Sequence, residues 1–98
     1  CHCNSMRRAA RVDANHAEIT GTLRQCGWVV HDTSGTGAGF PDLLAGKAGR
    51  LVMIEVKDGA KPPSARRLTQ DEALFHAKFA GAGVTVAILS SAEEAVAL

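Results

Sequence analysis

Residues 40–59 read FPDLLAGKAGRLVMIEVKDG and contain the two most apolar stretches of the chain. DLLA and LVMIEVK flank the turn sequence GKAG, which predicts an antiparallel β-hairpin. LVMIEVK is almost continuously apolar, as expected of a central strand that is covered on both faces. Asp42, Glu55 and Lys57 nevertheless stand in these stretches. Because charged side chains are almost never fully buried without a partner, these three residues need a compensating interaction.

Strand geometry is expected to bring the three charges together. Alternate residues of a strand share a face, so Glu55 and Lys57 point the same way, roughly 6–7 Å apart at Cα. A hairpin loop of two or four residues would put Asp42 opposite or diagonal to Glu55 on that face, whereas three or five residues would turn it away unless a bulge intervened. GKAG suits an even-numbered loop. The same face would carry Leu51 and Met53, and the opposite face Val52, Ile54 and Val56.

A divalent metal ion would explain why two carboxylates stand side by side. Carboxylates about one strand spacing apart repel each other, and one of them would take up a proton unless a cation lay between them. Lys57 can supply one positive charge, and a divalent ion would supply more. Oxygen ligands suit Mg²⁺ or Mn²⁺ rather than zinc. We therefore expect Asp42 and Glu55 to share an ion at the edge of the core.

The chain before the hairpin predicts a helix, a strand and a loop. A helical pattern begins at Asp13, which can cap it, and Gly27 offers a left-handed end. WVVH at 28–31 predicts a short strand, and SGTGAG at 34–39 predicts a loop. The apolar positions of the helix are Ile19, Leu23 and Cys26.

The chain after the hairpin predicts a loop, a helix, a strand and a last helix. DGAKPPSARR at 58–67 is expected to be irregular because its prolines break regular structure. Thr69 and Glu72 form a capping box for a helix that ends at Gly81 or Gly83. VTVAILS at 84–90 predicts a strand parallel to LVMIEVK, since a helical crossover leads to it. Ser91 and Glu94 form a second capping box.

The predicted order, α-β-β-β-α-β-α, indicates an α/β fold, a small mixed β-sheet flanked by helices. A length of 98 residues suits a single domain, expected over residues 11–98 after a flexible segment at 1–10. The net charge of +1 favours no class of partner. Basic residues do gather locally, at Arg7, Arg8 and Arg11 and in KPPSARR, which would fit contact with phosphates.

Three cysteines do not make a disulfide framework, so a reducing compartment such as the cytoplasm is expected. Cys1-His2-Cys3 lacks the second ligand pair that a structural zinc site needs, and a frayed terminus is the simpler interpretation. No run reaches the eighteen apolar residues of a membrane span, and no signal peptide is recognised.

Several residues resemble a known family of nucleases. Pro41-Asp42, twelve further residues and then Glu55-Val56-Lys57 resemble the PD-(D/E)xK nuclease signature. The wider pattern GAGFPDLLAG, LVMIEVKDG and KPPSARRLTQDEALFH is similar to small phage-type members of the VRR-NUC (virus-type replication-repair nuclease) domain, relatives of Holliday junction resolvases. The similarity spans about residues 11–96. It implies a restriction-endonuclease-like α-β-β-β-α-β core.

The resemblance also implies a set of active-site residues. Asp42 and Glu55 would bind Mg²⁺, for which Mn²⁺ can substitute, together with the main-chain carbonyl of Val56. Lys57 would orient or help to deprotonate the attacking water. Glu18, on the first helix, matches an upstream acid of the family and would bind metal directly or through water.

One position departs from the family pattern. Related sequences commonly carry a glutamine on the active-site side of the helix that follows the Leu-Thr pair. Glu72 stands near that place in this chain, and the nearest glutamine is Gln70. Either residue could take that role, and Glu72 could be occupied as a cap.

Two segments are expected to contact DNA. The glycine-rich loop, with Ser34, Gly37 and Gly39, would allow the backbone to approach a nucleic-acid strand closely, because glycine has no side chain to obstruct it. Lys61, Arg66 and Arg67 would contact phosphates, which gives affinity without sequence specificity.

The leading hypothesis is a Mg²⁺-dependent endodeoxyribonuclease that hydrolyses phosphodiester bonds in branched DNA, such as Holliday junctions, inside a bacterium or a phage-infected cell. A homodimer with two active sites is attractive because so small a domain has little surface for a junction. No small-molecule cofactor and no membrane are expected.

Two alternatives stay open. One is a nuclease of the same fold that acts on linear or damaged DNA, or that needs a partner subunit for targeting. The other is a DNA-binding module that has lost catalysis. The presence of both Asp42 and Glu55 disfavours the module, since without metal their charges would repel phosphates.

The remaining aromatic and histidine residues have simpler interpretations. Trp28 is predicted to anchor the core, and Phe75 and Phe79 are predicted to belong to it. His76 is predicted to lie on the helix surface. His16 and His31 are assigned no role in the site.

Overall fold

The computed structural model describes residues 15–98. The predicted segment 1–10, the first arginine cluster, Cys1-His2-Cys3 and the Asp13 cap lie outside the described residues. The elements are α2 (His16–Gln25), β1 (Val29–Asp32), β2 (Leu43–Lys47), β3 (Arg50–Val56), the 3₁₀ helix η1 (Pro63–Arg66), α3 (Gln70–Gly81), β4 (Ala87–Leu89) and α4 (Ala92–Ala97). The predicted order and the small mixed α/β fold are confirmed, except that one 3₁₀ turn interrupts the segment predicted to be irregular.

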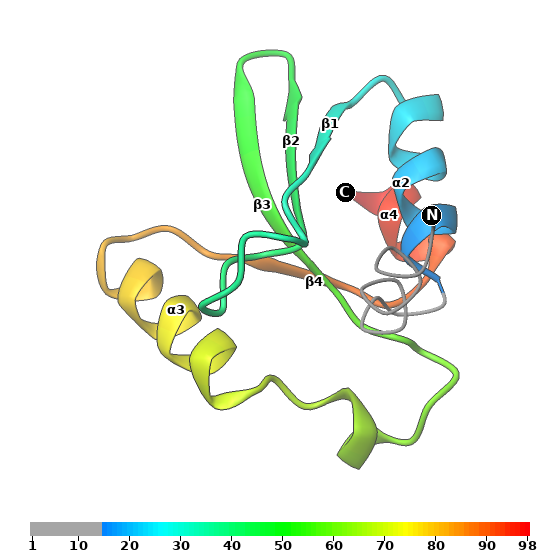
Figure 1. The fold of residues 1–98 in the computed structure, drawn as a ribbon. Coiled ribbons are helices and arrows are strands. Elements are labelled where there is room, and N and C mark those ends of the chain that lie inside the picture. The colour runs from blue at the N-terminus through cyan, green and yellow to red at the C-terminus, as the bar shows by residue number, and fades with distance from the viewer. Residues whose placement is uncertain (1–14) are drawn as a thin grey trace, which may run out of the picture.

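The four strands form one sheet in the order β1-β2-β3-β4 (Figure 1). β1 pairs with β2 and β2 with β3 in antiparallel fashion, and β3 pairs with β4 in parallel, as predicted. Lys47 pairs with Arg50, so the hairpin loop has two residues, Ala48 and Gly49, with φ of 51° and 81°. Positive φ at both positions is typical of the turns that match strand twist. The even-numbered loop is therefore confirmed.

The core lies on the face of the sheet that α2 and α4 cover (Figure 1). Every second residue of β3 faces it, as the alternation predicted: Ile54 and Val56 are buried and Val52 is partly buried. Trp28 is a core residue, as predicted. The other members of the buried cluster are Ile19, Leu23, Val30, Leu43, Ala45, Leu89 and Ala95.

The opposite face of the sheet is covered only in part, because α3 lies on that side (Figure 1). No residue of α3 is buried, and Leu51 at the far end of β3 is 73% exposed. Phe75 stacks on Phe79 with ring centroids 4.5 Å apart, and Phe40 meets Phe75 edge-on at 5.3 Å. The prediction that Phe75 and Phe79 belong to the core was wrong: they form a half-buried aromatic group outside the buried cluster.

Of the two predicted capping boxes, one is complete and one is half formed. The capping box of Thr69 and Glu72 is confirmed. The second box is half formed: the Ser91 side chain accepts from the Glu94 N–H, but Glu94 accepts from the Ser90 N–H at 2.6 Å instead of from Ser91.

Asn15 connects the start of α2 to the sheet instead of capping its own helix. Its side-chain amide donates to the carbonyls of Lys57 and Ser90, at 2.9 and 2.8 Å. These two residues directly follow β3 and β4, so Asn15 fixes the helix against the carboxyl ends of two parallel strands. Within residues 15–98, the helices are too short or too polar to traverse a membrane.

Gly39 sets the distance between the glycine-rich loop and the start of α3. Gly39 and Gly37 both have positive φ, 79° and 81°. A Cβ on Gly39 would clash with the main-chain carbonyl of Asp71, whereas a Cβ on Gly37 would meet open space. We predict that Gly37→Ala costs about 1–2 kcal/mol of backbone strain, and that Gly39→Ala costs about 1–3 kcal/mol more because α3 must shift.

Urea denaturation of the two variants measures this difference. Gly37→Ala is the matched control, since it carries the same backbone strain without the clash. Equal stability of the two variants would contradict the close approach of Gly39 to α3.

Candidate active site

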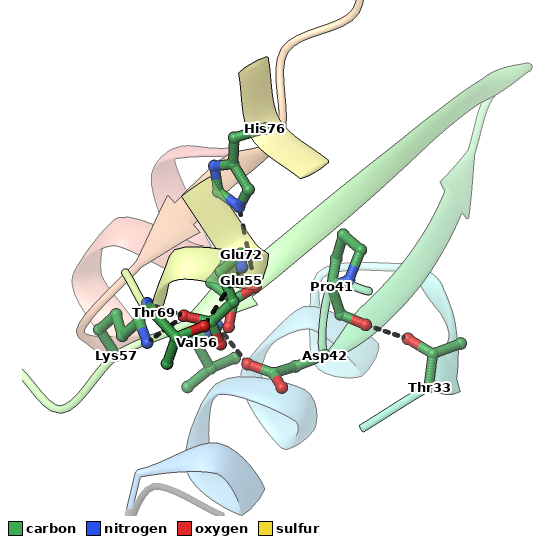
Figure 2. Close-up of polar contacts among 9 residues, drawn as sticks. All are labelled: Thr33, Pro41, Asp42, Glu55, Val56, Lys57, Thr69, Glu72 and His76. Carbon is green, nitrogen blue, oxygen red and sulfur yellow. Dashed lines mark hydrogen bonds and ion pairs between the residues drawn. The ribbon is translucent and has the colours of Figure 1, made fainter. Parts of the chain in front are cut away.

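The three predicted charges meet where β2 begins and β3 ends (Figure 2). Leu43 pairs with Ile54, so Asp42, one residue before β2, stands opposite Glu55. The Asp42 carboxylate accepts a hydrogen bond from the Val56 N–H, at 2.8 Å from Oδ2. The side chain of Asp42 thus continues the hydrogen-bond ladder past the end of β2. This contact fixes the position of one carboxylate and also gives it a structural role.

The Val56 carbonyl lies on the same side of β3 as Asp42. In an extended strand the N–H and C=O of one residue point toward the same neighbouring strand. Because the Val56 N–H reaches Asp42, the Val56 carbonyl also points toward the start of β2. An ion bound by Asp42 could therefore reach this main-chain oxygen.

Glu55 is the one acid among residues 15–98 that is fully buried, with 1% of its surface exposed. Its Oε1 atom has no hydrogen-bond partner. Burial raises the pKa of Glu55 to about 10, and the negative charge of Asp42 adds to the shift. Without a cation, the folded protein therefore holds Glu55 protonated at neutral pH. Burying this acid therefore costs free energy, as the sequence analysis expected for a charged residue in an apolar strand.

Lys57 is held next to these carboxylates by α3. Its Nζ lies 2.9 Å from Oε1 of Glu72, in a pair whose side chains are 13% and 17% exposed. The same Glu72 oxygen accepts the Thr69 N–H of the capping box. Burial raises the pKa of Glu72, but the hydrogen bonds from Lys57 and Thr69 outweigh it and lower that pKa below its ordinary value. Glu72 therefore joins the site and caps α3, whereas Gln70 is exposed.

His76 is a site residue that the sequence analysis missed. It was predicted to lie on the helix surface, but its Nε2 stands 3.8 Å from Oε1 of Glu55, with the side chain 15% exposed (Figure 2). Burial lowers the pKa of His76, and Lys57 adds to this while Glu72 opposes it. The available signal was the spacing of four residues from Glu72, which puts both side chains on one helix face.

Glu18 is exposed in the first turn of α2 and lines a hollow of about 400 Å³ together with Asp58 and Arg66. Its binding of a metal ion stays a prediction. In the described part of the chain, no three His, Cys, Asp or Glu side chains are placed to hold a metal ion. Binding of an ion by Asp42 and Glu55 would thus use backbone and water oxygens as further ligands, or movement of a third side chain.

The residues predicted to contact DNA have local structural roles or lie at the surface. Ser34 donates to Asp32 Oδ1 from both its N–H and its hydroxyl, at 2.8 and 2.7 Å. Gly39 packs against the start of α3. The other four positions are Gly37, Lys61 and Arg67, which are exposed, and Arg66, which is half-buried. Contact of these residues with DNA stays a prediction.

No protein-family model, curated protein or solved structure matches the chain. The similarity to VRR-NUC domains therefore rests on the residues named above.

The buried carboxyl of Glu55 predicts a particular pH dependence of stability. In the unfolded chain the pKa of Glu55 lies near its ordinary value of 4.5, whereas in the folded protein it rises to about 10, so the folded protein keeps the proton over most of this range. Between these values the unfolded state binds fewer protons, so stability falls as pH rises, by up to about 1.4 kcal/mol per pH unit. Glu55→Gln removes this term while keeping the shape of the side chain.

Chemical denaturation in the presence of a chelator, at several pH values from 5 to 8, tests this expectation. The wild type should lose stability relative to Glu55→Gln as the pH rises. Glu93→Gln, which removes an exposed carboxylate on α4, is the matched control. A constant difference between wild type and Glu55→Gln across this range would show that Glu55 is not a buried acid.

Proposed function

We propose that this protein is a divalent-metal-dependent endodeoxyribonuclease that acts on branched DNA such as Holliday junctions. The observation that carries the proposal is the buried Glu55 carboxyl, with an unpartnered oxygen, beside Asp42 and close to the Lys57–Glu72 pair. Acids placed together in this way cost free energy in the absence of a cation. A reaction that requires a bound cation would explain why both acids are present.

The donor set fits Mg²⁺ or Mn²⁺. Asp42, Glu55 and the Val56 carbonyl provide oxygen atoms only, and the unpartnered Glu55 Oε1 has a free coordination position. Mg²⁺ is commonly bound by one or two carboxylates while it keeps several waters. When bound, such an ion would stabilise the negative charge that develops on the phosphate during hydrolysis.

Lys57 would act on the attacking water. Glu72 holds its ammonium group near the end of β3, where the Lys57 side chain is mostly shielded from bulk water. A positioned cation there would orient the water and stabilise charge on a phosphate oxygen. Because Glu72 is itself fixed by the Thr69 cap, the start of α3 supports this geometry.

The surface next to the site would hold DNA. The backbone at Gly37 is exposed without a side chain, whereas Gly39 packs against the start of α3, and Lys61 and Arg67 are exposed on the segment before α3. These groups would contact phosphates without sequence specificity. A homodimer would give a junction two active sites on one larger surface.

A second candidate, a DNA-binding module without catalysis, is supported by one observation. Asp42 already accepts the Val56 N–H, so its carboxylate has a role in the fold that needs no metal. The burial of a second acid, Glu55, has no such explanation, and for this reason we prefer the nuclease.

Removal of one negative charge should abolish cleavage without disturbing the fold. Asp42→Asn keeps a carbonyl oxygen that can accept the Val56 N–H, so the variant should fold while binding metal poorly. Lys57→Ala should reduce the rate by about 10²–10⁴-fold through loss of the positioned cation. Lys78→Ala, on the exposed side of α3, is the matched lysine control and should cleave normally.

The assay uses four-way junctions, flaps and linear duplexes with Mg²⁺, Ca²⁺ or a chelator. The proposal requires cleavage with Mg²⁺ that both site variants lose. Cleavage that persists in both variants would indicate a contaminating nuclease, and metal-independent binding without cleavage would favour the module.

Phosphate contacts predict a strong dependence of DNA binding on salt. Affinity for a junction, measured by fluorescence anisotropy in Ca²⁺, should fall steeply between 50 and 200 mM salt because each phosphate contact releases counterions. Lys61→Ala and Arg67→Ala should each lower the slope of log affinity against log salt by about 1. Lys78→Ala should leave the slope unchanged, and affinity independent of salt would contradict this mode of binding.

A further inference from the structure

Two buried polar atoms face each other at the site and lack hydrogen-bond partners. They are Nε2 of His76, from α3, and Oε1 of Glu55, from β3 (Figure 2). Buried polar groups normally have a partner, and each exception requires an explanation.

The distance between the two atoms is too long for a hydrogen bond and suits a shared ion. A hydrogen bond between nitrogen and oxygen spans about 2.7–3.2 Å, whereas these atoms are 3.8 Å apart. Neighbouring ligand atoms of an octahedral ion, each about 2.1 Å from it, are about 3.0 Å apart. One ion could therefore contact both atoms after the two side chains approach each other by a little under 1 Å.

The position of His76 leaves its Nε2 atom open to an ion. This atom is buried, makes no hydrogen bond and faces Glu55, and a neutral imidazole has one nitrogen with a lone pair. Glu72, one helical turn earlier, already bonds Lys57 and the Thr69 N–H through Oε1.

We propose that His76 is a nitrogen ligand of the ion bound by Glu55 and makes the site select Mn²⁺ over Mg²⁺. This inference rests on the proposed function, since it takes Asp42 and Glu55 as ligands of the same ion. Imidazole binds transition metals well, whereas Mg²⁺ prefers oxygen ligands and water. A site with two carboxylates alone would discriminate less between the two ions.

The experiment measures Mn²⁺ binding rather than cleavage. Mn²⁺ is titrated into the purified full chain and followed by electron paramagnetic resonance, with Mg²⁺ as competitor. Electron spin echo envelope modulation then reports whether a ¹⁴N nucleus is bound to the ion. The variants are His76→Gln, which replaces the nitrogen donor by an oxygen donor, Asp42→Asn, and the control His31→Gln, which removes an exposed histidine on β1.

The proposal expects a nitrogen signal in the wild type and in His31→Gln, and none in His76→Gln. Affinity for Mn²⁺ should fall about tenfold or more in His76→Gln while affinity for Mg²⁺ changes less than about twofold. A residue with only a packing role would alter neither the nitrogen signal nor the Mn²⁺/Mg²⁺ ratio. The wild-type spectrum tests the idea even if His76→Gln does not fold.

Two results would overturn the proposal, and they are distinguishable. If Mn²⁺ binds and Asp42→Asn abolishes binding, but the wild type shows no nitrogen signal or His76→Gln retains it, the role of His76 is wrong and the nuclease proposal stands. If Mn²⁺ does not bind, or binds equally to Asp42→Asn, then the metal site itself is wrong and both proposals fail.

Discussion

The burial of the Glu55 carboxyl at the end of β3 is the constraint on which the rest of the site depends. β3 is an interior strand, with β2 on one side and β4 on the other, so its last residues cannot turn to solvent without breaking two ladders. The register of the two-residue hairpin then puts Asp42 beside Glu55. Two acids are thereby forced together where water is scarce, and the pKa of Glu55 rises to about 10.

α3 supplies the other two side chains of the candidate site, Glu72 and His76. One carboxylate oxygen of Glu72 both caps the helix and pairs with Lys57. One turn later the same helix face presents His76 to Glu55. Since α3 has no buried residue of its own, its position depends on these polar contacts, on the aromatic group of Phe40, Phe75 and Phe79, and on the close approach of Gly39. A shift of α3 would move Glu72 and His76 together.

Local patterns were sufficient to predict the hairpin and the capping box, because turn residues, strand alternation and the Thr-x-x-Glu spacing act over a few residues. They also predicted that Asp42, Glu55 and Lys57 lie close together, because the hairpin register determines which residues of the two strands stand opposite each other. The missed features depend on packing between distant segments. His76 reaches the site only because of where α3 lies on the sheet, and Asn15 bonds carbonyls 42 and 75 positions away. Glu18 was assigned to the site by family pattern alone, and in the structure it lines a hollow with Asp58 and Arg66.

A purely structural role explains Asp42 but not the pair of acids. Asparagine at position 42 could accept the Val56 N–H without adding a charge, and an apolar or amide side chain at position 55 would remove the cost of burying an acid. The chain instead has carboxylates at both positions, opposite one another and next to a fixed lysine. Such a combination lowers stability in the absence of a cation, because the negative charge of Asp42 adds to the cost of ionising the buried Glu55. On the proposal that a divalent ion binds here, the combination would become favourable once the ion is bound, and stability would be coupled to binding at this end of the sheet.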